Sequence, residues 1–316
     1  MRSGLGRRSY TGAGTFALSE SGTLVYADGE NRSLGHLVVG RPGRLDTLPA
    51  GREAFLRFAM TPDRKRLAAV VETLDGEQLR IYDLQTGRFA PWFTAFEVRQ
   101  PTWNPQADSI AFVVADSLFI GSPNDARAPR GVQLAGLDFE PFAWRTGGRL
   151  FGTGWERNQA VVVGIEQRPY SVDTLARDVA FPLLSPDERW LAYSDRAFTT
   201  AWLEPYPADG RRYQLKSGWV GEAHWLSSKE LLVTHWDSTG WRADRVQIGA
   251  SPAAGMTHSP WIRMARFLDP PGLSVSVTPD GGLLYVQGSP ATPVSHFRVV
   301  PNWVAEMKRA VDAASP

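Results

Sequence analysis

The 316-residue chain is 43% hydrophobic and 21% charged, with a formal net charge of +1. This balance offers neither the basic stripe of a nucleic-acid binder nor an acidic tail, and the absence of cysteine excludes disulfides and thiolate metal sites. The sequence contains no run of about 18 apolar residues, so we expect no membrane insertion by this chain.

Residues 1–11 form a basic, glycine-rich lead-in, in which Arg8-Ser9-Tyr10 is a candidate strand for closing a ring. No apolar stretch follows these charges, and the segment therefore does not fit a secretory signal peptide. As the chain stands, we expect a cytoplasmic location.

From residue 12 onward one unit recurs: a large apolar residue, a four-residue turn and an apolar strand. The turns start at residues 19, 61, 104, 145, 185, 226 and 278, mostly 40 to 43 residues apart. Proline fixes φ at these turns, and Ser, Thr and Asp side chains can bond the backbone that they bend. The residues before the turns (the pre-turn residues below) are Leu18, Met60, Trp103, Trp144, Leu184, Trp225 and Val277.

A repeat of this length with several short strands is typical of a β-propeller blade. We predict an all-β fold: a single β-propeller of four-stranded blades over residues 12–300, with blades starting near residues 12, 52, 95, 136, 177, 218 and 270. Seven blades are preferred, and six remain the alternative because the turns at Arg145–Gly148 and Leu226–Ser228 lack Pro and Asp. The last blade lacks a fourth strand, which the N-terminus could supply.

Residues 301–316 are predicted to form a short C-terminal helix and tail. Asn302 would cap the helix, and apolar residues would occupy one side of it. We expect that side to dock on the outside of the ring.

The repeat resembles the TolB-like, WD40-like repeat propellers found C-terminal to many bacterial serine/threonine protein kinases. The turns at Thr61-Pro62-Asp63, Ser185-Pro186-Asp187 and Thr278-Pro279-Asp280-Gly281 carry the likeness, and so does the ending Val299-Val300-Pro301-Asn302-Trp303. The resemblance implies an extracytoplasmic sensor or interaction half of a longer membrane protein. The kinase motifs themselves, a Gly-rich nucleotide loop, His-Arg-Asp and Asp-Phe-Gly, are not in this sequence.

We predict no catalytic, cofactor-binding or metal-binding residues. The sequence has no Gly-x-Ser-x-Gly elbow and no His-Glu-x-x-His, and its five histidines have no metal-ligand spacing. His235-Trp236-Asp237 is the most suggestive cluster, although a hydrogen-bonded loop explains it better. The recurring Asp63, Asp187 and Asp280 are interpreted as turn formers.

The tryptophans divide into two groups. Trp103, Trp144 and Trp225 occupy the pre-turn position, which core packing explains. A second group falls in loops together with arginines, and because aromatic and Arg side chains supply most interface energy, it is the candidate binding rim. The alternative is packing at blade edges, with Arg stems over the rings. The rim consists of Trp219, Trp236, Trp241, Arg211, Arg212 and Arg242.

Three functions stay open. The first is a monomeric, non-catalytic sensor or interaction module for a protein or peptide, with a small ligand possible at the channel. The second is a TolB-like scaffold in a cell-envelope complex. The third is a propeller hydrolase or lyase, which would need three or more Asp, Glu, His or Arg side chains converging on one channel mouth, and the sequence shows no such pattern.

Overall fold

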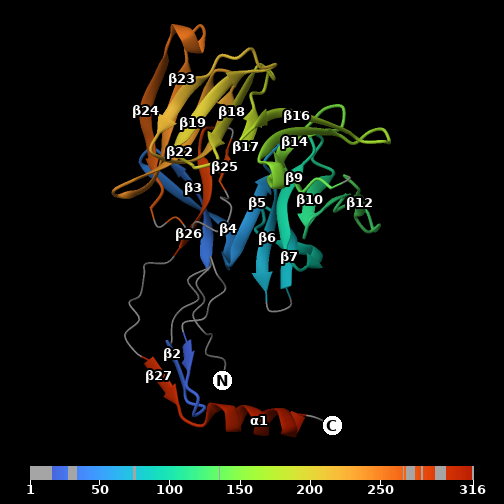
Figure 1. The fold of residues 1–316 in the computed structure, drawn as a ribbon, viewed down its shortest axis with the longest axis vertical. Helices are drawn as coiled ribbons and strands as arrows, with labels where there is room; N and C mark the ends of the chain where they lie inside the picture. Colours follow the sequence, from blue (N-terminus) through green and yellow to red (C-terminus); the bar gives the residue numbers. More distant parts are fainter. Residues whose placement is uncertain are drawn as a thin grey trace.

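The computed structural model describes residues 16–27, 34–73, 76–134, 136–265, 267, 275–278, 280–288 and 297–314. Their strands form six antiparallel sheets of four strands and one of three, and a single α-helix, α1 (Trp303–Ala314), lies near the C-terminus (Figure 1). Two short 3-10 helices, η1 (Trp155–Arg157) and η2 (Pro252–Ala254), complete the described elements. The predicted all-β propeller with a C-terminal helix is confirmed. The residues 1–11, including the proposed strand Arg8-Ser9-Tyr10, lie outside the described residues.

Five blades are built from four consecutive strands each. The first two contain β5 (Phe55–Met60), β6 (Arg66–Thr73), β7 (Gly76–Asp83) and β8 (Phe89–Ala95), and then β9 (Val98–Trp103), β10 (Ile110–Val114), β11 (Ser117–Gly121) and β12 (Arg130–Val132). The third contains β13 (Phe139–Arg145), β14 (Arg149–Gly154), β15 (Gln159–Gly164) and β16 (Ser171–Arg177), the fourth β17 (Val179–Leu184), β18 (Trp190–Asp195), β19 (Thr200–Pro205) and β20 (Tyr213–Ser217), and the fifth β21 (Trp219–Ser227), β22 (Glu230–Asp237), β23 (Gly240–Ile248) and β24 (Met256–Arg263).

The sixth blade joins the two ends of the ring. Its inner strands β25 (Ser276–Val277) and β26 (Leu283–Gly288) come from the C-terminal part, and its outer strands β3 (Gly35–Arg41) and β4 (Arg44–Glu53) from the N-terminal part. β26 pairs with β3 over six residue pairs, from Leu283↔Gly40 to Gly288↔Gly35. The N-terminus therefore contributes two strands to the closure rather than the one that the sequence suggested.

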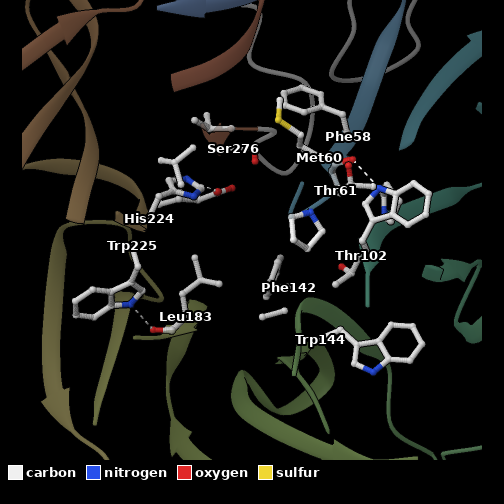
Figure 2. Close-up of a pocket in the computed structure, with 18 of the residues that line it drawn as sticks. Phe58, Met60, Thr61, Thr102, Phe142, Trp144, Leu183, His224, Trp225 and Ser276 are labelled. Atoms are coloured by element: carbon white, nitrogen blue, oxygen red, sulfur yellow. Dashed lines mark hydrogen bonds and ion pairs between the residues drawn. The ribbon is translucent and has the colours of Figure 1, made fainter. Parts of the chain in front are cut away.

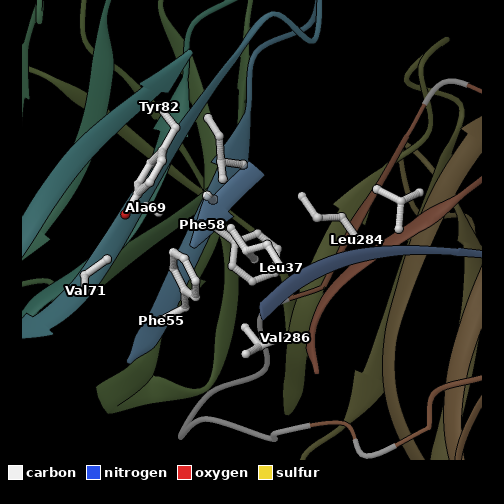
Figure 3. Close-up of a cluster of buried hydrophobic side chains, with 11 residues drawn as sticks. Leu37, Phe55, Phe58, Ala69, Val71, Tyr82, Leu284 and Val286 are labelled. Atoms are coloured by element: carbon white, nitrogen blue, oxygen red, sulfur yellow. The ribbon is translucent and has the colours of Figure 1, made fainter. Parts of the chain in front are cut away.

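The structure contains seven antiparallel sheets, and six of them form the closed ring, the blade count that the sequence left as the alternative. The innermost strands β5, β9, β13, β17, β21 and β25 contact one another in sequence around a closed circle. Six buried hydrophobic clusters lie between successive blades, one at each of the six junctions. Figure 3 shows the junction at the closure, where Leu37 and Leu284 of the mixed blade meet Phe55, Phe58 and Tyr82 of the next one.

The seventh sheet is the first repeat, and it is not part of the ring. β1 (Phe16–Leu18) pairs with β2 (Leu24–Ala27), which pairs with β27 (Phe297–Val300). Figure 1 shows this sheet and α1 lying apart from the six blades. Val304, Met307 and Val311 of the helix are exposed, so the expected docking of its apolar side on the ring does not occur here. We call β1, β2, β27 and α1 the terminal module.

The turns of the repeat connect the first and second strands of each blade. Thr61 Oγ1, Ser185 Oγ and Thr278 Oγ1 each donate a 2.6 Å hydrogen bond to the Asp two residues later. The hydroxyl of Ser185 also accepts from the backbone N–H of Arg189 and Trp190, both at 3.1 Å. These bonds hold the bend, as expected of Asp63, Asp187 and Asp280 as turn formers.

The inner strands carry β-bulges at matching positions. In five blades the pairing between first and second strands shifts register three to five residues before the turn, for example between Pro141 and Ala143. A bulge bends its strand and re-aims the side chains next to it. This recurring irregularity lies along the axis of the ring, where a candidate site would be expected.

Two pre-turn tryptophans join neighbouring blades. Trp103 Nε1 donates to the carbonyl of Ala59, and Trp225 Nε1 donates to the carbonyl of Leu183, both at 3.0 Å. Ala59 and Leu183 occupy the same place in their own blades, one residue before the pre-turn residue. The predicted structural role of these tryptophans thus includes a repeated hydrogen bond across the blade junction.

Candidate binding site in the central channel

A pocket of about 450 Å³ occupies the channel at the end of the ring where the repeat turns lie. Its lining comes from the inner strands of all six blades, including Phe58, Thr102, Phe142, Leu183, His224 and Ser276. Figure 2 shows these side chains around one open space, with the rings of Trp144 and Trp225 directed away from it. The indoles therefore pack between blades, and the channel wall is made by the residues beside them.

Two acid–base side chains belong to the channel wall. Glu222 and His224 alternate along β21, and both are buried. Glu222 Oε2 lies 2.9 Å from His224 Nε2, yet without hydrogen-bond geometry, so this buried nitrogen has no hydrogen-bond partner among the described residues. The backbone of Glu222 is held in place by Thr234, whose hydroxyl accepts from the Glu222 N–H and donates to its carbonyl.

Further in, a second group of charges surrounds the axis. Arg99 Nη1 of β9 lies 2.9 Å from Glu140 Oε1 of β13, an ion pair between adjacent blades. Arg57 of β5 donates to the carbonyl of Leu56, and its buried Nε has no hydrogen-bond partner among the described residues. Burial lowers the pKa of Arg57, and the carboxylates of Glu140, Glu222 and Glu77 oppose that shift.

Two arginines line the same pocket at the turn end. Arg64 belongs to the turn between β5 and β6, and Arg145 is the last residue of β13. Arg145 donates from Nη2 to the carbonyl of Leu184 at 2.9 Å, and its buried Nε has no partner among the described residues. Burial lowers the pKa of Arg145, with Glu188 acting in the opposite direction.

The structure brings four of the six predicted rim residues together. Ring centroids of Trp219, Trp236 and Trp241 lie 6.0 to 6.4 Å apart, and Arg242 pairs with Asp237 beside them. Trp219 is 61% exposed and Trp236 43% exposed, whereas Trp241 is buried and continues the stack into the core through Phe267. These residues surround the start of β21, at the end of the ring opposite the turns.

Arg211 and Arg212 are not part of that cluster. They precede β20, and because Tyr213 pairs with Leu203 near the turn end, they lie at the other end of the blade from Trp219. About seven extended residues, roughly 20 Å of strand, separate the two positions. Arg211 pairs with Asp209, and Arg212 stacks over Trp202 with 4.2 Å to the ring centroid, which is the blade-edge packing offered as the alternative.

His235-Trp236-Asp237 is not a loop but the end of strand β22. His235 is buried, with Nε2 3.1 Å from Asp244 Oδ1, and Lys216 Nζ lies 2.6 Å from the other oxygen of that carboxylate. Burial would raise the pKa of Asp244, but the close approach of His235 and the hydrogen bond from Lys216 outweigh it and lower the pKa to about 2. The histidine is therefore held in a structural ion-pair group.

Among the described residues no group of three or more His, Cys, Asp or Glu side chains could hold a metal ion. Within the same part of the chain, no helix has the length and apolar character needed to cross a membrane.

The fold was compared with those of known proteins. No family model matches the sequence, and no curated protein is significantly similar to it. A solved structure assigned as TolB from Agrobacterium tumefaciens superposes with a TM-score of 0.60 at 14% identity, covering 82% of this chain and 99% of that one. The chain has a TolB-like propeller fold.

Other solved propellers are similar to a lesser degree. TolB from Acinetobacter baumannii gives a TM-score of 0.53 at 15% identity, over 90% of this chain and 63% of that one. A protein assigned as a 6-phosphogluconolactonase from Bacteroides fragilis gives 0.51 at 12% identity, over 81% of this chain and 88% of that one. At these identities the likeness shows the TolB-like propeller fold alone.

The channel residues Glu222 and His224 were not predicted from the sequence. Glu222 and His224 alternate with apolar residues on a predicted inner strand, just before the weakest of the repeat turns. Their positions, three and one residues before the pre-turn residue Trp225, were the sequence feature that could have indicated a place in the channel wall. That signal is visible only when the seven copies are aligned on the pre-turn residue and the bulge is known.

Proposed function

We propose that this TolB-like propeller is a binding module that takes a peptide segment or small ligand into the turn-end mouth of its channel. The observation that carries the proposal is the pocket of about 450 Å³ lined by the inner strands of every blade. Its volume lies in the range of ligand sites, and it combines apolar walls with a few converging polar groups, as such sites do.

The proposal is tested with a peptide library displayed on phage and selected on the purified protein. Ser276 lines the channel, so Ser276→Trp narrows it, and selected peptides should bind this variant at least about tenfold more weakly. Ser217→Trp places the same side chain at an exposed position and serves as the control. Peptides that bind Ser276→Trp and wild type equally would place binding outside the channel.

The rim residues Trp219, Trp236, Trp241 and Arg242 are proposed as a second contact surface on the opposite end of the ring. Two exposed indoles beside an Arg–Asp pair are the composition of an interface anchor. Trp236→Ala should weaken a partner that uses this end and leave channel peptides unaffected, which surface plasmon resonance can compare directly.

The sensor role and the association with a kinase rest on the resemblance of the repeat turns and of the ending Val299–Trp303. An antibody to the propeller, used on soluble and membrane fractions of native cells, tests them. A large band in the membrane fraction supports a sensor in a longer chain. A band of this chain's own mass in the soluble fraction supports a standalone propeller, and recovery in an envelope complex supports the scaffold role.

A hydrolase or lyase is the second candidate. Four residues of the types required, Arg64, Arg145, Glu222 and His224, line one pocket, and Glu222 with His224 forms a potential acid–base pair. The test is turnover of a panel of lactones and esters by wild type and by Glu222→Gln. Turnover that is lost in Glu222→Gln would replace the non-catalytic proposal by an enzymatic one.

A further inference from the structure

The channel carries its charges in layers. Counting back three residues from each pre-turn residue gives one ring of equivalent positions, and among the described residues these are Arg57, Gln100, Pro141, Phe181 and Glu222. One residue deeper lie Arg99 and Glu140, which pair with each other. Glu222 is thus the channel-lining carboxylate on a ring whose other polar members are Arg57 and Gln100.

Glu222 is available to a ligand. Its side chain is 9% exposed, and among the described residues the only ion-pair partner of its carboxylate is His224, which approaches without hydrogen-bond geometry. A buried carboxylate gains most from a donor that reaches it inside the channel, because water is largely excluded there. The bonds between the Glu222 backbone and Thr234 hold the carboxylate in position before any ligand arrives.

The inner channel offers one carboxylate to a ligand. Arg99 and Glu140 pair with each other, and Glu77 lies on the third strand of its blade, where its carboxylate accepts from the backbone N–H of Val98. Glu222 is therefore the carboxylate that lines the pocket. No carboxylate of the described residues lies within ion-pair distance of Arg57, so Arg57 does not neutralise Glu222 by contact.

The mouth of the same pocket has the opposite sign. Arg64 and Arg145 line its turn end, and the buried Nε of Arg145 has no partner among the described residues. Between the two charged levels Phe142 and Leu183 give the wall an apolar side facing the space that Figure 2 shows, and Thr102, His224 and Ser276 line the rest of it. A ligand that fits this polarity carries a cation at its inner end, an apolar middle and an acceptor or anion at its outer end.

We propose that Glu222 binds a primary ammonium group carried on an apolar body, with the free amino terminus of a peptide as the ligand that fits the whole channel. The ammonium donates to the Glu222 carboxylate, the first side chains pack on Phe142 and Leu183, and a following acidic residue meets Arg64 and Arg145. This inference rests on the proposed binding function of the channel and names the chemistry of its ligand.

The test uses the tripeptide Leu-Leu-Glu with a free amino terminus, its N-acetyl form and phenethylamine, each titrated calorimetrically into the full chain. Wild type should bind the free tripeptide, and acetylation should weaken binding at least about tenfold. Glu222→Gln should cause a similar loss, whereas Glu166→Gln, an exposed carboxylate outside the channel, should not. The acetylation comparison needs no variant, so the proposal remains testable if Glu222→Gln does not fold.

Each result of these titrations either supports or overturns the ammonium site at Glu222. Binding of phenethylamine that depends on Glu222, without binding of the tripeptide, supports the ammonium site and assigns it to a small amine. Equal binding of free and acetylated tripeptide overturns the ammonium site, and if Ser276→Trp weakens both, the channel remains the binding site. Absence of binding by all three probes to wild type overturns the ammonium site while leaving the peptide selection to test the channel.

Discussion

The first repeat and the six later repeats share one turn signature but lie in different surroundings. The turn at Ser19 joins β1 to β2 in the terminal module, and the later turns join the first two strands of the six ring blades. Leu18, the pre-turn residue of the first repeat, is 50% exposed, whereas Trp103 and Leu184 are buried. The signature therefore specifies a hairpin, and membership of the ring depends on what the strands bury.

The strands that follow the turn differ between the two regions in how many of their residues are buried. In the ring, β6 buries five consecutive residues, Leu67 to Val71, because both of its faces contact neighbouring blades. β2 has four residues, and none of the six buried clusters contains a residue of β1, β2 or β27. A strand with two apolar faces needs blades on both sides, and the short strands of the first repeat do not.

The largest expected effect is the loss of stability when a leucine is truncated in the ring rather than in the terminal module. Leu37→Ala removes a fully buried side chain at the ring closure and should lower the free energy of unfolding by about 2 to 5 kcal/mol. Leu18→Ala makes the same change in the terminal module and should cost less than about 0.5 kcal/mol. Urea unfolding followed by tryptophan fluorescence measures both; similar losses would mean that the terminal module is packed as tightly as the ring.

The buried charges of the ring should make it sensitive to acid. The pKa of Asp244 lies at about 2 in the fold against an ordinary value of 3.8. A lowered carboxyl pKa stabilises the fold fully above the ordinary value and loses that contribution as the pH falls towards 2. The contribution is on the order of 2 kcal/mol.

Asp244→Asn should therefore be less stable than wild type at pH 5, and the difference should shrink as the pH approaches 2.5. Unfolding free energies across this range measure it. Asp312→Asn, in the exposed helix of the terminal module, is the control and should follow wild type throughout. A gap between Asp244→Asn and wild type that stays constant with pH would contradict the assignment of the ion-pair group.

Much of the ring could be predicted from the sequence, and the reasons are local. Turn residues and apolar strands are encoded within each repeat, so the repeat pattern alone predicts the hairpins from which the propeller is built. The blade count could not be obtained in this way, because it depends on whether β3 pairs with β2 or with β26. The apolar run Leu37-Val38-Val39 suits either pairing, and in the structure β3 pairs with β26.

The candidate site was less accessible to prediction for the same reason. Glu222 and His224 lie two residues apart on β21, but Arg57 on β5 is far from them in sequence and approaches Glu222 only because the inner strands converge on one axis. The rim was partly predictable, because Trp236 and Trp241 are paired across a hairpin. Arg211 and Arg212 lie at the other end of the blade from Trp219, a separation set by the length of β20 that the sequence pattern does not show.

A smaller effect is expected at the blade junctions. Trp225→Phe removes the N–H that bonds the carbonyl of Leu183, which should cost about 1 kcal/mol. Trp303→Phe, the same change in the helix of the terminal module, should leave the main unfolding midpoint unchanged. Chemical denaturation of the two variants tests this, and an equal loss in both would show that the junction bond adds nothing particular to the ring.

The smallest expected loss of stability comes from removing the turn hydroxyl, which can be compared between the ring and the terminal module. Ser185 is fully buried, and its hydroxyl accepts from two backbone N–H groups. Ser185→Ala leaves the N–H of Trp190 short of a partner, while that of Arg189 keeps a longer bond of 3.4 Å to Asp187 Oδ1, and the change should cost about 1 kcal/mol. Ser19 is exposed, and its hydroxyl accepts from one backbone N–H, that of Thr23, and shares a hydrogen bond with the hydroxyl of Ser21, both of which water can reach. Ser19→Ala should therefore cost only a few tenths of a kcal/mol. Thermal unfolding of the two variants compares one substitution at one position of the repeat, and equal losses would mean that the turn contributes the same stability whether or not the ring surrounds it.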